Sequence, residues 1–231
     1  MTLRFSSPSF FEHLIWLPIR VFTHLFGSAN INGIEHVLAV QGNAIVASNH
    51  VTELDPLIIV ASLPFFSNLL PLIYVVKDKK FYRSNWNGLR KTFYGGSYFR
   101  IIGGYEAYSG LNDYEQALTN HLQAIEQGLS VCIFPVGRMH ADGAYRQARG
   151  GVAYLAAQTG LPIIPVHIQG VNQHTTLRDY LRRKPKLRVT FGQPIYARDI
   201  FEEPLNAITK SSQQECEKAA IAVMKKIAEL G

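Results

Sequence analysis

A histidine and an aspartate five positions apart are the residues of this chain best suited to chemistry. His50 and Asp55 follow a short apolar run at 44–47 that is typical of a buried strand. On a regular helix, residues i and i+5 point roughly 140° apart, so the two side chains would not meet there. Pro56 disfavours helical dihedrals at Asp55, and an Asp-Pro pair is favourable as a helix N-cap and first helical residue. We therefore expect a turn that brings the carboxylate to one ring nitrogen and leaves the other facing a cleft, the arrangement of an oriented general base.

The same residue types are compatible with less specific sites. A His and an Asp this close in sequence commonly lie in a surface turn that caps a helix. Spacing alone therefore does not identify a general base, which is recognised first by its geometry. Two further pairs, His50 with Glu53 and His140 with Asp142, contain metal-ligating types, but neither has a third matched ligand, so no metal site is predicted. The chain also lacks the Gly-x-Ser-x-Gly turn of a serine hydrolase.

Apolar strand-like runs alternate with helical runs along most of the chain. Strands are expected at 43–48, 72–77, 100–103, 130–134, 162–168 and 187–191, and helices at 56–63, 111–127, 150–159 and 204–230. This alternation predicts a single α/β domain at 30–231, with a mainly parallel central sheet flanked by helices. Ligands of such sheets collect beyond the carboxyl ends of the strands, which is where His50 and the turn at 134–138 are expected.

Residues 1–29 form a separate N-terminal segment in this scheme. Apolar residues recur at helical spacing between positions 10 and 26, with polar residues interrupting the other face. An amphipathic helix at a membrane interface and a helix packed on the core both fit this pattern. The uncharged stretch 56–76 is not expected to cross a membrane, because two prolines and a Ser-Asn pair interrupt it.

The chain is basic, and its positive charges are concentrated in one region. The formal net charge is +6, and cations cluster in one short segment. They are Arg178, Arg182, Arg183, Lys184, Lys186 and Arg188. Anionic lipid, an acidic protein or plain solvent fits such a cluster, whereas nucleic acid is not expected because no nucleic-acid-binding motif accompanies it. Two cysteines, Cys132 and Cys216, provide no disulfide framework, which favours a reducing compartment.

Three motifs in a fixed order give the chain a family resemblance. They are Asn-His-x-x-x-x-Asp-Pro at 49–56, Phe-Pro-x-Gly at 134–137 and Leu-Pro-Ile-Ile-Pro-Val at 161–166. Over about residues 30–200 the chain resembles the glycerolipid acyltransferases, the family typified by lysophosphatidic acid acyltransferase. The ordered set is much more specific than any one of its motifs.

The resemblance implies a peripheral membrane O-acyltransferase on the cytoplasmic face. His50, oriented by Asp55, would deprotonate a hydroxyl of a lysophospholipid-type acceptor, which then attacks the thioester of an acyl-CoA or acyl carrier protein. Backbone N–H groups near Gly137 would stabilise the oxyanion. No cofactor or metal is implied, and membrane lipids and acyl carrier protein are the expected partners. Substrate contacts are expected from Asn49, Lys77, Phe134, Pro135, Val136, Gly137, Arg138 and Arg149.

The chain departs from the family pattern where that family holds the acceptor phosphate. The usual Phe-Pro-Glu-Gly-Thr-Arg is Phe-Pro-Val-Gly-Arg-Met at 134–139, and the stretch 103–109 lacks its usual arginine. Alternative cations for the phosphate are Lys77, Arg138, Arg146 and Arg149. Two other functions therefore stay open: a lipid- or acyl-carrier-binding relative with impaired catalysis, and a phospholipid remodelling transacylase. If the missing carboxylate serves the acceptor, Val136→Glu should raise activity.

Overall fold

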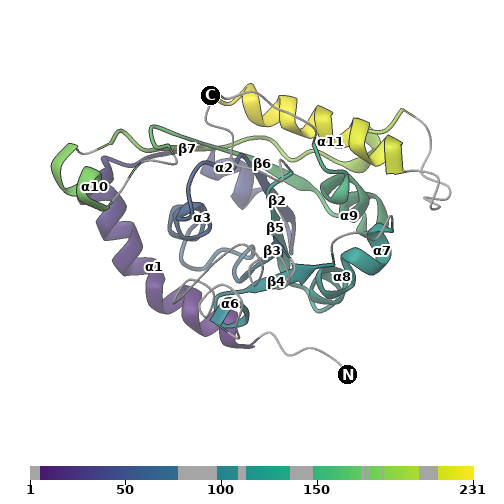
Figure 1. Cartoon of the computed structure of the whole chain (residues 1–231), viewed down its shortest axis with the longest axis horizontal. Helices are drawn as coiled ribbons and strands as arrows, with labels where there is room; N and C mark the ends of the chain where they lie inside the picture. The colour runs from purple at the N-terminus through teal and green to yellow at the C-terminus, as the bar shows by residue number, and fades with distance from the viewer. Residues whose placement is uncertain are drawn as a thin grey trace.

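A computed structural model shows a seven-stranded sheet with helices on both faces (Figure 1). The structure describes residues 6–77, 98–108, 113–135, 148–172, 175, 177–183, 185–202 and 213–231. The strands are β1 (Asn30–Asn32), β2 (Ile45–Ser48), β3 (Leu72–Lys77), β4 (Gly104–Ala107), β5 (Ser130–Ile133), β6 (Ile163–Gln169) and β7 (Arg188–Phe191). Their order across the sheet is β1-β7-β6-β2-β5-β3-β4.

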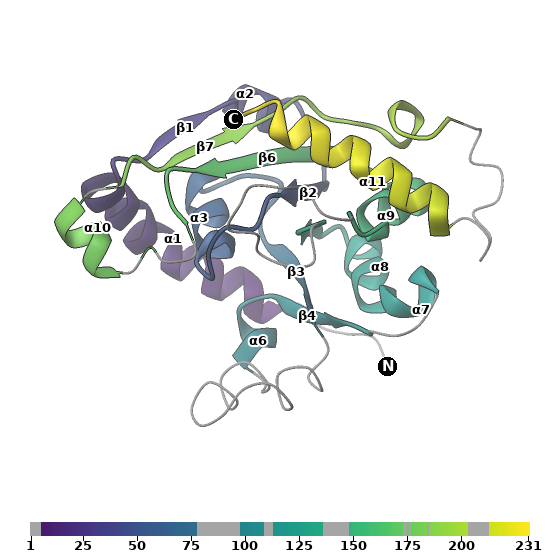
Figure 2. The same ribbon diagram turned by 45° about the horizontal axis from the view of Figure 1, so that its top comes forward.

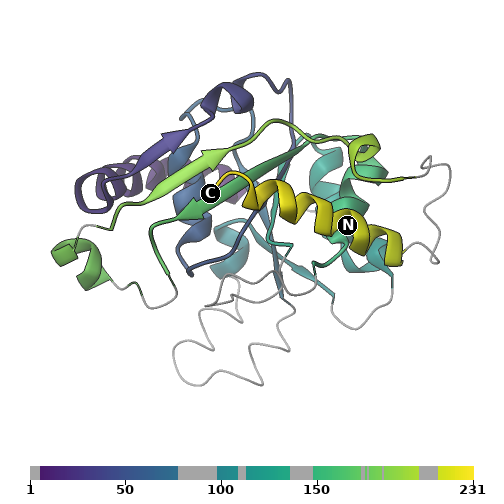
Figure 3. The same cartoon turned by 90° about the horizontal axis from the view of Figure 1, so that it is seen from above.

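The sheet is mainly parallel, as the alternation of strands and helices predicts. β2 pairs in parallel with β5 and β6, and β3 pairs in parallel with β5 and β4. β7 and β1 run in the reverse direction: β7 is antiparallel to β6, and β1 pairs in parallel with β7 at the sheet edge (Figure 3). The carboxyl ends of β2, β5 and β3 therefore meet at one edge of the sheet.

The helices are divided between the two faces. Their bounds are α1 (Ser6–Gly27), α2 (Ile34–Leu38), α3 (Asp55–Ser62), α6 (Tyr98–Ile101), α7 (Tyr114–Ala117), α8 (Thr119–Glu126), α9 (Gly151–Thr159), α10 (Leu177–Arg183) and α11 (Gln213–Ala228), with a 3₁₀ turn η1 at Ala197–Asp199. α1 and α3 lie on one side of the sheet, and α8, α9 and α11 lie on the other (Figures 1 and 2). Each side has its own apolar core, and every residue of β2 and β5 is buried between them. Strands covered on both faces favour such continuous apolar runs.

The long N-terminal helix α1 packs along α3 and donates hydrogen bonds to the carbonyl groups at its C-terminal end. The indole N–H of Trp16 donates to the Leu63 carbonyl at 2.9 Å, and the Arg20 guanidinium donates to the Ala61 carbonyl at 2.7 Å. The last carbonyls of a helix have no partner within it and carry partial negative charge, so these donors stabilise the end of α3. The inner face of α1 is thus part of the folded domain.

The outer face of α1 is apolar and exposed. Phe10, Leu14, Leu17, Val21 and Leu25 recur every three or four residues and are 45–73% exposed. One face of α1 therefore packs on the core, as one of the two interpretations expects, and membrane contact through the other face stays a prediction. Among the helices that the structure describes, none combines the length and apolarity needed to span a bilayer.

Three expectations about single elements were wrong. The apolar run 100–103 is not a strand, because α6 ends there and Gly103 turns the chain with φ +85° into β4. The helix expected at 111–127 is broken at Leu118, which separates α7 from α8. Residues 30–32, which lie outside the expected strands, form the edge strand β1. Of the helix expected at 204–230, the part at 204–212 lies outside the described residues.

Candidate active site

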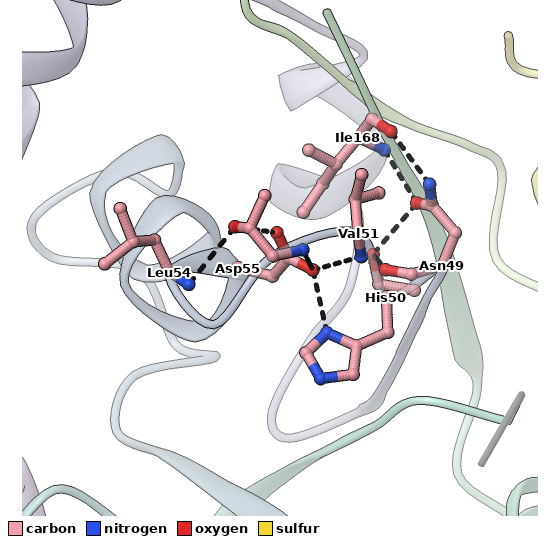
Figure 4. Close-up of polar contacts among 8 residues, drawn as sticks. Asn49, His50, Val51, Leu54, Asp55 and Ile168 are labelled. Carbon is pink, nitrogen blue, oxygen red and sulfur yellow. Dashed lines mark hydrogen bonds and ion pairs between the residues drawn. The ribbon is translucent and has the colours of Figure 1, made fainter. Parts of the chain in front are cut away.

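His50 and Asp55 are in direct contact beyond the carboxyl end of β2 (Figure 4). The ring Nδ1 of His50 lies 2.8 Å from Oδ2 of Asp55, and the carboxylate is fully buried while the imidazole is 30% exposed. The other ring nitrogen points away from Asp55 (Figure 4). Nε2 has no hydrogen-bond partner within the part of the chain that the structure describes. The expected turn is present, with one nitrogen held and one available.

Four hydrogen-bonding groups converge on the Asp55 carboxylate. Besides the His50 ring, the backbone N–H groups of Val51 and Thr52 donate to Oδ2 at 2.6 and 2.9 Å, and the Thr52 hydroxyl donates to Oδ1 at 2.8 Å. Thr52 Oγ1 in turn accepts from the Leu54 N–H at 3.1 Å. An ionised carboxylate is an acceptor only, so its oxygens suit this set of donors. The arrangement holds the carboxylate against the imidazole.

These contacts correct the expected role of Asp55 as a helix cap. Asp55 is the first residue of α3, and its carboxylate faces backward to residues 51 and 52. The contact from the Thr52 N–H back to the Asp55 carboxylate is one half of a capping box, while the Thr52 hydroxyl accepts from Leu54 instead of from the Asp55 N–H. Thr52 was not singled out from the sequence, although a threonine three residues before an acidic residue is the signal of this motif.

Asn49 anchors the histidine loop to the neighbouring strand. Its Nδ2 donates to the Ile168 carbonyl at 2.8 Å, and its Oδ1 accepts from the Ile168 N–H at 2.8 Å (Figure 4). Both polar groups of this side chain are thereby used by the backbone of β6. The structure gives Asn49 a positioning role that the sequence motif alone did not reveal.

Phe134 and Pro135 lie against the histidine from the end of β5. The Phe134 ring stacks on the His50 imidazole, with centroids 4.4 Å apart and planes inclined by 24°. The carbonyl of buried Pro135 accepts from the backbone N–H of Arg149 at 2.7 Å, which ties the turn after β5 to the start of α9. The Arg149 side chain is exposed. Two strands and a helix start therefore converge around the imidazole.

Of the remaining residues expected to contact substrate, only Lys77 lies within the described part of the chain. Lys77 is the last residue of β3, half-buried at the same edge of the sheet. Val136, Gly137 and Arg138 lie outside the described residues, as does Arg146. Within the described ranges, no cluster of three or more His, Cys, Asp or Glu residues is arranged to hold a metal ion.

Comparison with known proteins agrees with this geometry. The family model described as acyltransferase matches residues 28–169, which is more than half of the chain. The chain belongs to the acyltransferase family. Matching residues cover β1 through β6 and include the His50–Asp55 loop and the turn after β5.

Similar proteins carry a more specific name. A probable 1-acyl-sn-glycerol-3-phosphate acyltransferase of Mycoplasma pneumoniae is 24% identical over 187 residues, which cover 77% of this chain and 64% of that protein. A chloroplastic 1-acyl-sn-glycerol-3-phosphate acyltransferase of Brassica napus is 23% identical over 216 residues, covering 87% and 56% respectively. The chain thus spans about half to two-thirds of the length of these curated relatives.

A solved structure shares the fold of this acyltransferase. The crystal structure of the 1-acyl-sn-glycerophosphate acyltransferase PlsC from Thermotoga maritima superposes with a TM-score of 0.57, covering 95% of this chain and 80% of that one. The two sequences are 19% identical, so the likeness concerns the fold. It supports the α/β architecture described above.

Proposed function

We propose that this acyltransferase moves a fatty acyl group from a thioester onto a hydroxyl of a lysophospholipid, with His50 as the general base. The observation that carries the proposal is the 2.8 Å contact between His50 Nδ1 and the buried Asp55 carboxylate, with Nε2 left available. A carboxylate at Nδ1 selects the tautomer with an unprotonated Nε2 and stabilises the imidazolium that forms when Nε2 accepts a proton.

The chemistry follows from that tautomer. Nε2 takes the proton of the acceptor hydroxyl as its oxygen bonds to the thioester carbonyl carbon. The tetrahedral intermediate then collapses, the carbon–sulfur bond breaks, and the proton on Nε2 passes to the departing thiolate. The donor is an acyl-CoA or an acyl carrier protein, and both release a free thiol. This sequence of steps uses no cofactor or metal.

The proposed acceptor is 1-acyl-glycerol-3-phosphate or a close relative. Support comes from the names of the similar proteins and from Lys77, which stands at the same sheet edge as His50. Valine at position 136, where the family has glutamate, favours a second candidate, a relative that binds lipid or acyl carrier protein without turnover. A remodelling transacylase would differ from both by needing no thioester.

One panel of assays separates these functions. Purified protein is offered acyl-CoA and acyl carrier protein donors with lysophospholipids that differ in headgroup, and products are identified by mass. The proposal predicts a diacyl product that requires a thioester and is formed fastest with a phosphate-bearing acceptor. Product formed from two lysolipids without a thioester would identify a transacylase, and no product with any pair would favour the binding role.

We further propose that the protein attaches peripherally to the cytoplasmic face of a membrane through α1 and α10. The exposed stripe of α1 and Phe66, which is 90% exposed beside it, supply apolar surface. α10 packs beside α1 and carries the exposed cations Arg178 and Arg182. Such cations near anionic lipid are worth about 1 kcal/mol each.

Vesicle sedimentation tests this attachment. Leu14→Ser together with Leu17→Ser should weaken binding at every salt concentration, because apolar burial is not screened. Arg178→Gln with Arg182→Gln should weaken it only at low salt and only with anionic lipid. Equal binding of all forms to neutral and anionic vesicles would refute the proposal.

A further inference from the structure

A small cavity opens between α1, α3 and β3, next to the start of β4. It measures about 50 Å³, several times the roughly 10–15 Å³ that one water needs. Its walls are almost entirely apolar: Phe11 and Ile15 from α1, Leu57 and Val60 from α3, Val76 from β3, and Ile102 before β4. Pro56 also lines it, and Pro56 directly follows Asp55. The cavity therefore reaches the first turn of α3, the helix that begins at Asp55.

One carboxyl group interrupts these apolar walls. Glu12 of α1 is only 1% exposed, and its Oε2 accepts from the Leu72 N–H at 2.9 Å. Its other oxygen, Oε1, has no hydrogen-bond partner among the residues that the structure describes. Burial raises the pKa of Glu12 to about 8, so the group is mostly a neutral acid at pH 7. A neutral acid can both donate and accept a hydrogen bond.

Glu12 lines the cavity, and a residue without a side chain stands next to its Oε1. Gly103 lies beside it, and a Cβ there would stand 3.6 Å from Oε1 and 2.5 Å from the Leu72 carbonyl. The Tyr74 hydroxyl, the second polar group of the wall, already donates to the Pro56 carbonyl at 3.1 Å. Oε1 is thus the polar atom of the wall whose hydrogen-bonding capacity is unused.

The chemistry of the walls selects a class of ligand. An aliphatic chain matches the apolar residues, and a hydroxyl on that chain can pair with Oε1. An ammonium group would bring three donors to a wall with too few acceptors, and a carboxylate would place a second acid against Glu12. A neutral hydroxyl is the group that satisfies both partners.

We propose that this cavity is a specificity site for an aliphatic chain bearing a hydroxyl group, which hydrogen-bonds to Glu12. The proposal rests on the proposed function only for how the chain arrives, as the acyl group of the donor or as the chain of the lysolipid acceptor. The bound part is short, since the cavity holds only a few carbons and the hydroxyl. The rest of the chain lies outside it.

Binding to the intact protein tests the site without turnover. The probes are free fatty acids of one length, either unsubstituted or carrying one hydroxyl or one amino group at successive carbons, measured by calorimetry. We expect one hydroxyl position to bind about two- to tenfold more tightly than the unsubstituted acid, the worth of one neutral hydrogen bond. Equal affinity at every position, or preference for the amine, would overturn the proposal whether or not the protein is an active enzyme.

Variants of Glu12 identify the partner group. Glu12→Gln keeps a donor and an acceptor and should retain the preference, whereas Glu12→Met should lose it. Glu35→Met, which changes a carboxyl that is 75% exposed on α2, is the matched control and should behave as wild type. Preference that survives Glu12→Met in folded protein would overturn the role of Glu12. If that variant does not fold, the position series on wild-type protein still decides the matter.

Turnover then identifies which substrate supplies the chain. One arm uses a hydroxylated acyl donor with a plain lysolipid, and the other uses a plain donor with a hydroxylated lysolipid. A higher kcat/KM in either arm, lost in Glu12→Met, supports the site and assigns the chain. The absence of preference in both arms of an active enzyme counts against it.

Discussion

Two buried carboxyl groups on the same side of the sheet have opposite surroundings. Asp55 and Glu12 are 0% and 1% exposed. Both lie near Cys132, whose thiol pKa is raised well above its usual value by burial first and then by these two acids. Asp55 faces two backbone N–H groups, a hydroxyl and an imidazole. Glu12 has one backbone N–H.

The difference shows that donors, and not burial, decide what a buried acid can do. Burial alone favours the neutral form, which is the case for Glu12. In the proposed mechanism, the donors around Asp55 hold its carboxylate beside the general base. The same residue class would then orient the imidazole at one end of α3 and provide a hydrogen-bonding group in the wall of the cavity.

The largest expected effect comes from removing the anion at the first of these sites. Asp55→Asn keeps the shape but brings an amide N–H₂ toward donors and no longer stabilises a protonated His50. Because general-base catalysis contributes about 10²–10⁴-fold, kcat/KM should fall by that order. Asp113→Asn alters a helix-capping aspartate of α7 and is the matched control, with circular dichroism reporting the fold of both. Unchanged turnover in Asp55→Asn would remove Asp55 from the mechanism.

Glu12 should make stability depend on pH in the direction opposite to a salt-bridged acid. Its pKa is about 8 in the folded protein and near 4.5 when exposed. A raised folded pKa gives stability that is fully present below pH 4.5 and is lost as pH rises through about 8. The loss is on the order of 5 kcal/mol, since each pKa unit is worth about 1.4 kcal/mol.

Denaturant unfolding between pH 5 and pH 9 measures this dependence as the difference between wild type and Glu12→Gln. The glutamine is uncharged at every pH, so the free energy of unfolding of the variant should increase relative to that of wild type as pH rises. A difference that stays constant across this range would show that Glu12 is not a neutral acid in the folded protein. Glu35→Gln, at an exposed carboxyl, supplies the baseline.

A smaller effect is expected from removing one donor at Asp55. Thr52→Val is close in shape and deletes the 2.8 Å hydrogen bond to Oδ1. A hydrogen bond to a charged group is worth about 1.5–3 kcal/mol, so activity should fall roughly tenfold or more while remaining above that of Asp55→Asn. Thr119→Val removes an exposed hydroxyl at the start of α8 that donates to the Glu115 carbonyl of α7, and it should leave activity unchanged. A full loss in Thr52→Val would mean that the loop, and not the charge, had failed.

The sequence predicted those parts of the molecule that local patterns determine. The strands that became β2, β3, β5, β6 and β7 were placed within two residues of their ends, because buried parallel strands are short apolar runs. The contact between His50 and Asp55 followed from Pro56, which restricts the turn between them. Local patterns failed at Gly103. The residues before it have the composition of a strand, and only the left-handed backbone conformation of Gly103 shows that a helix ends there.

Other parts of the site depend on contacts distant in sequence. Asn49 meets Ile168 across 119 positions, and Glu12 meets Leu72 across 60. Nothing near Glu12 in the sequence distinguishes it from a polar residue on the outer face of an amphipathic helix. The tertiary packing of α1 on α3 and β3 is what buries it, so its chemistry could not be read from local spacing.

The most direct test of the account compares two histidines of equal exposure. His50 and His36 are each 30% exposed, but His36 lies 4.0 Å from Glu35, a carboxyl that is 75% exposed. Single-turnover acyl transfer from a thioester to a lysophospholipid is measured for His50→Ala and His36→Ala, with folding checked in both. The account predicts a loss of at least about 10²-fold for His50→Ala and near wild-type rates for His36→Ala. Near-normal transfer by folded His50→Ala protein would contradict it.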